Sequence, residues 1–406
     1  MIYLQKLKNN KSLISNYLIT FINTFHPLFI LYYVTFEIDL KTYGEIIYYV
    51  AWCNIFMVLF DFGLNLCLTS RYRTIHENLI LKISSTLLIY RLLFILMLTL
   101  IFALFYIFII ESYLIISLMI LMIGLLLQVS IPMELYWSLK KIHFYLPVLV
   151  IAKVIGITFF YINLSDKNAL FIYANHLLII SIMQVFLISI TLKIWKHFRR
   201  SLKIFSYYKY SVTFFLNKGS STYVSSVPRI LLKSVSDEIL YSVYILYDQI
   251  YSMIQSLIQP LSMNILGKNK SNTSAKDYSV KIIKSTLIIS LIILISGLLS
   301  VVGIQSFGSL ASLDYFIAYL AVFYIILTSF KICNSIFGLP LHTLLRIQIK
   351  SNTDVIIQSL AVLILLYSIY LSNFLTVYLA IFCIILTELF LLMFRLLRVR
   401  KSLYEY

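Results

Sequence analysis

Residues 84–110 read SSTLLIYRLLFILMLTLIFALFYIFII, an apolar stretch whose only charged side chain is Arg91. The hydrocarbon core of a bilayer is about 30 Å thick, and a helix of roughly 20 apolar residues crosses it. This stretch is therefore predicted to form a membrane-spanning helix. The same pattern recurs along the chain, and the candidate spans are residues 13–35, 43–67, 84–110, 112–137, 144–163, 169–192, 211–235, 240–266, 285–305, 313–337, 354–371 and 374–394.

The composition of the whole chain agrees with this pattern. Of its 406 residues, 61% are hydrophobic and only 12% are charged, which excludes a soluble globular protein. We predict an all-α polytopic membrane protein with twelve transmembrane helices in two six-helix lobes around a central cleft. No loop between the spans is long enough to form a basic domain, so the net charge of +17 does not indicate a nucleic-acid partner.

Lys and Arg residues between the spans lie almost entirely on one side of the predicted membrane. The N-terminal segment, the even-numbered loops and the C-terminal tail together contain 25 of the 33 basic residues. The opposite loops contain only Lys41 and Lys167. Because cytoplasmic loops are enriched in Lys and Arg, both termini are predicted to be cytoplasmic. The first span is too long for the apolar part of a cleavable signal peptide, so we expect it to be retained.

The two halves of the chain show traces of a repeat. The basic loop from Lys193 to Lys209 divides the sequence into residues 1–200 and 201–406, with six spans in each. At an offset of 201 positions, Asn16, Pro27, Glu37 and Tyr43 of the first half correspond to the identical residues Asn217, Pro228, Glu238 and Tyr244 of the second. Both halves begin on the same side of the membrane, so we predict two lobes related by an axis along the membrane normal.

Two prolines and three asparagines in these corresponding spans suggest a path through the protein. Pro27 and Pro228 each remove a helical hydrogen bond and can act as hinges, although prolines in membrane helices often only shape packing. Asn16 and Asn23 are seven residues apart and share a helical face. Together with Asn217, they are predicted to line the cleft.

Six cations lie inside the predicted spans: Arg91, Lys153, Lys218, Arg229, Lys233 and Lys331. A charge at the bilayer centre costs at least ~2.5 kcal/mol unless it is compensated. Water or an anionic substrate could compensate these cations. We predict that Arg91, Lys153, Lys218 and Arg229 form a cationic substrate-binding site, whereas Lys233 and Lys331 lie near span ends and can reach the membrane interface.

The predicted spans also contain acidic residues. Asp61, Asp248 and Glu388 can carry a coupling proton or form static ion pairs with the cations, and static pairing is the more common role. Glu134, which follows Pro132, is a fourth acid of this kind. The chain has no catalytic motif of the HExxH or GxxxxGKS type, and its four cysteines lack metal-ligand spacing. We therefore expect no catalytic residue, no metal and no cofactor.

One short motif resembles a known family. The run Asp61-Phe62-Gly63-Leu64-Asn65, followed by Thr69 and Arg71, is similar to the end of the second helix in the O-antigen flippase (Wzx) family. That family belongs to the multidrug/oligosaccharidyl-lipid/polysaccharide exporter superfamily. Tyr43-Gly44 and the segment from Gly338 to Leu341 resemble further parts of it.

The resemblance implies a flippase of the bacterial inner membrane. It would move an undecaprenyl-diphosphate-linked oligosaccharide of the O-antigen or capsule type across the bilayer by alternating access, as a step in lipopolysaccharide or capsule biosynthesis. Its partners would be this lipid-linked oligosaccharide, membrane lipids, and a glycan polymerase with its chain-length machinery. A diphosphate-linked substrate is an anion, which agrees with the buried cations.

Other functions remain open. A small-molecule or drug exporter of the same superfamily is the main alternative, although a cavity for cationic drugs should be richer in acids than these spans are. A membrane glycan polymerase is less favoured, because such enzymes carry a large external loop and no external loop here exceeds about a dozen residues. A purely structural role would leave Arg229 unexplained.

Overall fold

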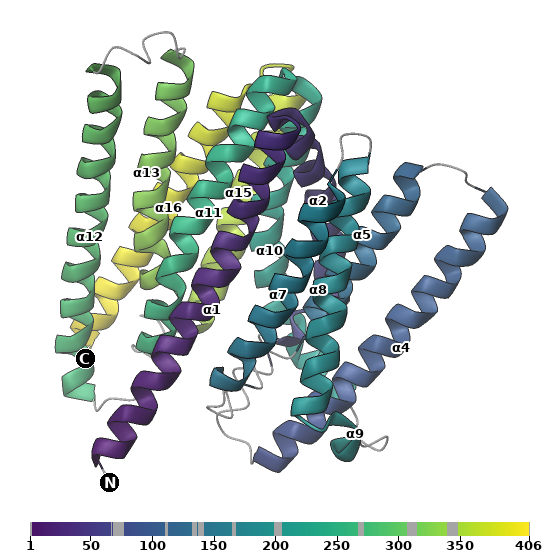
Figure 1. Cartoon of the computed structure of the whole chain (residues 1–406). Coiled ribbons are helices and arrows are strands. Elements are labelled where there is room, and N and C mark those ends of the chain that lie inside the picture. Colours follow the sequence, from purple (N-terminus) through teal and green to yellow (C-terminus); the bar gives the residue numbers. More distant parts are fainter. Residues whose placement is uncertain are drawn as a thin grey trace. The chain divides into compact units, whose positions relative to one another are not determined.

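The computed structural model describes residues 2–65, 67, 77–109, 113–131, 136, 142–164, 168–198, 205–266, 272–306, 315–338 and 348–405. Within these ranges it contains thirteen α-helices and no strand (Figure 1). The helices are α1 (Ile2–Glu37), α2 (Leu40–Asp61), α4 (Glu77–Ile109), α5 (Tyr113–Ser130), α7 (Ile142–Asn163), α8 (Ala169–Thr191), α9 (Ile194–His197), α10 (Phe205–Val235), α11 (Glu238–Leu266), α12 (Asn272–Ser306), α13 (Tyr315–Phe337), α15 (Gln348–Leu371) and α16 (Val377–Glu405).

Twelve of the thirteen helices in the described ranges are long, and only α9, with four residues, is short. Ten of the long helices are apolar enough to cross a membrane by length and composition. The other two, α10 and α11, have 31 and 29 residues and are therefore long enough, but they carry more polar side chains. The predicted all-α polytopic fold is confirmed.

One predicted span is too long. The sequence suggests a helix over residues 43–67, but α2 ends at Asp61. The next two residues, Phe62 and Gly63, have φ angles of 48° and 67°, in the left-handed region where a helix cannot continue. The pattern of apolar residues alone does not reveal this turn, because most of the residues that follow it are also apolar.

The helices divide into two compact units. Unit 1 consists of Met1–Ile22 with Tyr32–Thr222, and unit 2 consists of Asn23–Leu31 with Tyr223–Tyr406. Helices α1 and α10 each contribute residues to both units. The division at residue 200 and the central cleft expected from the sequence stay predictions.

Unit 1 is held together by close packing of α5 and α7 against α8. At Gly124 of α5, a Cβ atom would lie 3.0 Å from the backbone N of Leu178, so the absence of a side chain allows α5 and α8 to approach closely. Leu126, Leu149 and Ile188 are almost fully buried in the core that these helices share.

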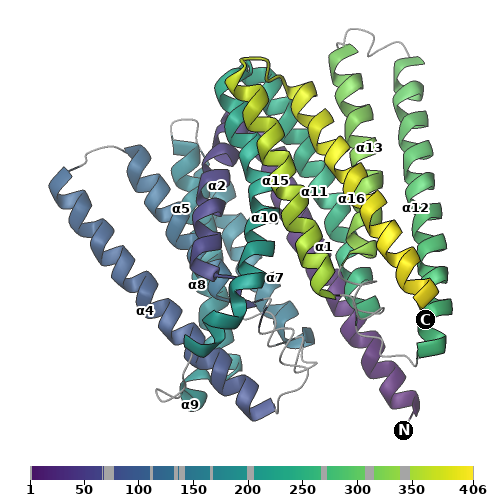
Figure 2. The same cartoon turned by 180° about the vertical axis from the view of Figure 1, so that it is seen from behind.

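Unit 2 is built mainly on the pairs α12–α13, α13–α16, α11–α13 and α15–α16 (Figure 2). Its core includes Phe337 of α13 and Val399 of α16, both almost completely buried. Large apolar side chains such as Ile364 and Phe390 are exposed on the outside of the helices. Outward-facing side chains of this kind are expected where helices contact lipid.

Candidate functional site

The Asp61-Phe62-Gly63-Leu64-Asn65 run forms the turn that ends α2. A Cβ atom at Gly63 would lie 2.8 Å from Phe215 Cα and closer still to Phe215 N, so no larger residue fits without moving the backbone of α10. The Phe62 ring stacks on the Phe215 ring, with centroids 4.6 Å apart. The turn therefore packs the end of α2 directly against the first half of α10 within unit 1.

The same turn holds the single charged side chain of the stretch 84–110. Arg91 donates from Nη2 to Asp61 Oδ1 at 2.9 Å and from Nη1 to Asn65 Oδ1 at 3.0 Å and the Val129 carbonyl at 3.1 Å. Asn65 also donates to the Val129 carbonyl at 3.1 Å. The Arg91 and Asp61 side chains are only 4% and 0% exposed. Arg91 is thus a fixed, fully buried cation.

Lys218 of α10 pairs with the same carboxylate. Its Nζ lies 2.7 Å from Asp61 Oδ2, and its side chain is 29% exposed. Asp61, Arg91 and Lys218 form what we call the Asp61 cluster, in which one carboxylate faces two cations. The cluster carries an excess positive charge, and Lys218 is its accessible member.

Lys153 of α7 is a third cation of unit 1. It is only 8% exposed and forms no ion pair with any residue that the structure describes. Helix α7 packs on α8, which contributes the fully buried His176 to the same unit. Lys153 therefore fits the prediction of a buried cation without an acidic partner.

In unit 2, Arg229 of α10 pairs with Asp248 of α11. Arg229 Nε lies 2.8 Å and Nη2 2.5 Å from the same oxygen, Asp248 Oδ2. Both side chains are partly buried. From the sequence alone, a purely structural role leaves the charge of Arg229 inside a span unexplained. In the structure, the ion pair with Asp248 gives this cation a structural partner.

Tyrosines surround this pair. Tyr247 of α11 stacks on Tyr324 of α13, with centroids 5.7 Å apart and an interplanar angle of 15°. Tyr244 and Tyr251 also lie beside Tyr324, at 6.3 and 5.9 Å. The sequence reasoning missed this cluster. A signal was present, because residues 244, 247 and 251 follow helical spacing and share one face of α11.

Glu388 lies in a second charged group of unit 2. Its Oε1 is 2.8 Å from Lys331 Nζ, and Asn334 Nδ2 donates to its Oε2 at 2.7 Å. Nearby, Arg398 Nη1 lies 2.5 Å from Asp354 Oδ1. Lys331, which the sequence predicts to reach the membrane interface, pairs with Glu388 and is 25% exposed. The Arg398–Asp354 pair was not anticipated, because both residues lie near predicted loops.

These pairs change the argument about the cations. Arg91, Lys218, Arg229 and Lys331 each form an ion pair with an acid, whereas Lys153 forms none within the described residues. Each of the acids Asp61, Asp248 and Glu388 forms an ion pair with one of the predicted span cations. Their binding or coupling roles stay predictions.

The remaining predicted residues lie on α1 and α10. Asn16 and Asn217 belong to unit 1, and Asn23, Pro27 and Pro228 belong to unit 2. Both prolines lie inside continuous helices. The hinge and cleft-lining roles of these five residues stay predictions.

The predictions from the sequence also include Pro132, Glu134 and Lys233. Pro132 and Glu134 lie outside the described residues. Lys233 Nζ lies over the Tyr241 ring, 5.5 Å from its centroid. This contact gives the cation an aromatic neighbour within unit 2.

Comparison with known proteins identifies the fold. No family model and no curated protein matches the chain. Solved structures do match it. An outward-facing multidrug resistance MATE family transporter of the MOP superfamily aligns with a TM-score of 0.65 and 13% identity, over 98% of this chain and 96% of that chain. The eukaryotic MATE transporter AtDTX14 aligns with a TM-score of 0.58 and 12% identity, over 98% of both chains.

A third structure is a MOP superfamily transporter from Pyrococcus furiosus, for which reverse polarity of the binding pocket suggests a different function. It aligns with a TM-score of 0.62 and 15% identity, over 98% of this chain and 95% of that chain. At these identities the likeness shows the fold, and membership of the superfamily expected from the motif around Asp61 stays a prediction. Membership of the O-antigen flippase family stays a prediction. The chain has the all-α fold of MATE transporters of the MOP superfamily.

Proposed function

We propose that this protein is a membrane transporter that works by alternating access and carries an anionic substrate. The Asp61 cluster is the observation that carries the proposal. One buried carboxylate faces two cations, and one of these, Lys218, is 29% exposed. An excess cation in a membrane protein is costly unless water or a ligand compensates it. A substrate with negative charge would provide this compensation.

The span cations of unit 1 form ion pairs with fewer acids than those of unit 2. Of the cations that lie in the predicted spans, Arg91, Lys153 and Lys218 belong to this unit, and Asp61 is the one described acid with which any of them forms an ion pair. In unit 2, by contrast, Arg229 and Lys331 each have an acid of their own. An anionic group is therefore expected to contact unit 1.

The members of the Asp61 cluster have different expected roles. Arg91 is held by Asp61, Asn65 and the Val129 carbonyl and is almost inaccessible, so it positions the carboxylate. Lys218 makes a single ion pair and has a flexible side chain. It can turn from Asp61 to a phosphate oxygen and back while Arg91 keeps Asp61 charged and in place.

The substrate we propose is an undecaprenyl-diphosphate-linked oligosaccharide, moved across a bacterial plasma membrane. Two observations support it: the resemblance of the Asp61–Asn65 turn to the O-antigen flippase family, and the partly exposed cation Lys218, which could contact a diphosphate. In keeping with that resemblance, the substrate would be delivered to the outer leaflet, where a glycan polymerase would use it.

A second candidate is the export of small molecules or drugs. The fold favours it, because the compared structures include a multidrug resistance transporter. The charges of unit 1 favour it less, since a cationic drug would meet an excess of cations there. Anionic or neutral small molecules would be compatible with both observations.

Transport by the purified protein in liposomes separates these candidates. The probe is a polyprenyl-diphosphate oligosaccharide with a fluorescent label that dithionite quenches only in the outer leaflet. We expect the protein to make the inner-leaflet label accessible. Lys218→Gln should slow this process by roughly tenfold or more, as expected when a charge-assisted hydrogen bond to substrate is lost. The matched control is Lys233→Gln on the same helix, which should keep most of the rate.

Two outcomes would contradict the proposal. If the wild-type protein does not increase the accessible label while it exports ethidium from cells, the second candidate is correct. If the Lys218→Gln and Lys233→Gln proteins move the lipid equally fast, the Asp61 cluster does not contact the substrate.

A further inference from the structure

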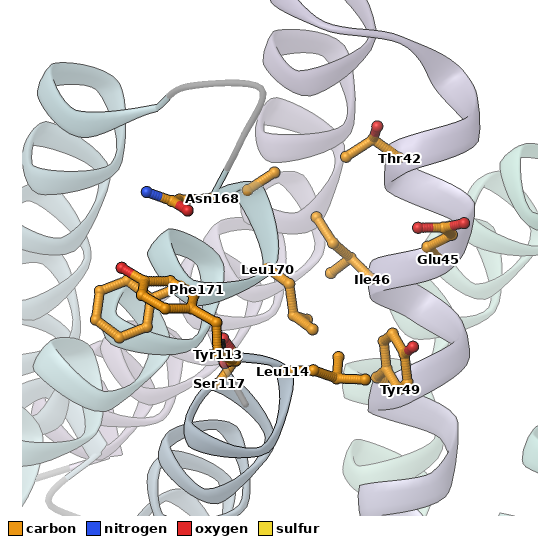
Figure 3. Close-up of a pocket in the computed structure, with 11 residues that line it drawn as sticks. Thr42, Glu45, Ile46, Tyr49, Tyr113, Leu114, Ser117, Asn168, Leu170 and Phe171 are labelled. Carbon is orange, nitrogen blue, oxygen red and sulfur yellow. Dashed lines mark hydrogen bonds between the residues drawn. The ribbon is translucent and has the colours of Figure 1, made fainter. Parts of the chain in front are cut away.

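A separate pocket opens at one end of unit 1, away from the Asp61 cluster. It lies among the first turns of α2, α5 and α8 and has a volume of about 300 Å³ (Figure 3). Because α2 begins just after α1 ends, the predicted topology places this end on the outer side of the membrane. None of the predicted site residues lines it.

One side of the pocket is aromatic. Tyr113 of α5 and Phe171 of α8 lie together, with centroids 5.2 Å apart and planes inclined by 48°. Figure 3 shows Tyr49 projecting from α2 on the opposite side. The Tyr113 side chain is 53% exposed, so its ring is available to a ligand. Aromatic faces carry partial negative charge and attract the C–H groups of a flat, partly apolar ligand.

Polar groups stand beside these rings. Glu45 and Thr42 line the pocket from α2, and Asn168 lines it from the start of α8. Asn168 is the N-cap residue of α8, but its side chain makes no capping hydrogen bond. Its amide therefore can donate to and accept from a ligand. The lining thus combines a carboxylate, an amide and a hydroxyl with aromatic faces.

The electrostatic balance of the pocket argues against a strongly charged ligand. Helices α2, α5 and α8 all begin here, and each helix N-terminus carries a partial positive charge of about half an elementary charge. The Glu45 carboxylate lies among them, and Asp39 caps α2 by accepting a hydrogen bond from Thr42 N at 2.6 Å, so two acids oppose this potential. A neutral ligand with many hydroxyl groups fits such a lining better than a phosphate or an ammonium ion.

We infer that this pocket binds a saccharide ring. A pyranose has an apolar C–H face that can lie on Tyr113 or Phe171 and a rim of hydroxyls that can bond to Glu45, Asn168 and Tyr49. A volume of about 300 Å³ is at the lower end of ligand pockets and suits a small sugar. The inference goes beyond the proposed function, because it concerns free sugar at an outer site and would stand if the transported substrate were not a glycolipid.

Saturation-transfer NMR on the full chain tests the inference. The probes are free glucose, galactose and N-acetylglucosamine. The protein is held in phosphatidylglycerol nanodiscs, because detergents with sugar headgroups would compete and choline lipids would supply ammonium groups. We expect saturable transfer to the ring C–H protons of at least one sugar. Phe171→Leu keeps apolar volume but removes the ring, and it should weaken binding by about two- to tenfold.

Control variants make the result specific. Tyr367→Leu removes an exposed tyrosine of α15 in unit 2 and should leave sugar binding unchanged. Glu45→Gln should weaken it only modestly, since an amide can still bond to hydroxyls. The inference is overturned if no sugar binds saturably, if Phe171→Leu binds as well as wild type, or if tetramethylammonium binds instead and Glu45→Gln abolishes that binding. None of these readouts depends on lipid transport, so this inference and the proposed function can fail separately.

Discussion

Asp61 and Lys218 are separated by 157 residues in the chain, yet the Lys218 ammonium donates to the Asp61 carboxylate at 2.7 Å. Eleven residues further along α10, Arg229 pairs with Asp248. The first pair lies within unit 1 and the second within unit 2. Helix α10 therefore carries an ion-paired cation into each unit, which helps explain why it is more polar than a helix selected only to cross a lipid bilayer.

The turn after α2 provides a sharp test of how this arrangement is built. We predict that Gly63→Ala destabilises the protein by about 2 kcal/mol or more, because Gly63 has a positive φ and its Cβ would collide with the backbone at Phe215. Gly219→Ala is the matched control. A Cβ at Gly219 would lie 3.5 Å from Val58 Cγ1, an ordinary contact, so this helical substitution should be neutral or stabilise by up to about 1 kcal/mol.

Thermal unfolding of the two variants in the same detergent measures the difference. The expected order of midpoints is Gly219→Ala at or above wild type and Gly63→Ala clearly below it. Equal midpoints would show that the α2 turn adapts and that its glycine is not required by the packing against α10.

The carboxylate of Asp61 should be essential for stability. Asp61→Asn leaves two cations facing a neutral amide, and removing one partner of a buried ion pair costs about 3–5 kcal/mol. Asp237→Asn makes the same chemical change at an exposed acid and should have little effect. The comparison is read from thermal midpoints and from the amount of protein that accumulates in the membrane. A normal Asp61→Asn midpoint would mean that Arg91 and Lys218 are compensated by other groups.

The parts of this fold that could be predicted are local properties of the sequence. Apolar length alone indicates twelve long helices, and α4 is a clear example, because Arg91 is the single charged residue of its stretch from Ser84 to Ile109. The end of α2 could not be placed in the same way, because Leu64 and Cys67 beyond the turn are as apolar as the helix before it. The turn is determined by Gly63 and its contact with α10, which is a tertiary feature.

The candidate site shows the same limit. The types and approximate depths of Arg91, Lys218 and Arg229 could be recognised from the sequence, because charged residues in apolar spans are rare. Their partners could not, since Asp61 could have paired with any of the three unit-1 cations and in fact pairs with Arg91 and Lys218 but not with Lys153. Pairing depends on which faces of the helices meet, and no spacing along one helix determines that.

Lys153 allows function to be separated from stability. Lys153→Met replaces a buried ammonium group that has no ion-pair partner among the described residues, so the variant should be as stable as wild type or more stable. If Lys153 contacts an anionic substrate, the same variant should move the labelled glycolipid more slowly, and Lys153→Arg should retain part of the rate. A stable Lys153→Met protein with full transport would remove Lys153 from the binding site.

The predicted orientation can be tested with reporter fusions. The charge distribution predicts that fusions after Lys41 and Lys167 report the outer side and that fusions after Arg73 and Lys203 report the cytoplasm. Paired reporters, one active only outside and one active only in the cytoplasm, provide the control at every position. An external signal after Lys203 would contradict the division into two halves of six helices.

Arg229 decides whether a cation of unit 2 also contacts substrate. Arg229→Ala alone is ambiguous, because it leaves Asp248 without its ion-pair partner and can reduce the amount of folded protein. The double variant Arg229→Ala with Asp248→Ala removes both charges and should accumulate normally. If the pair is only structural, this double variant transports the glycolipid at the wild-type rate. We expect instead that it accumulates and transports poorly, whereas Arg229→Lys keeps the charge and retains part of the rate. Transport rates normalised to the amount of reconstituted protein distinguish the two outcomes.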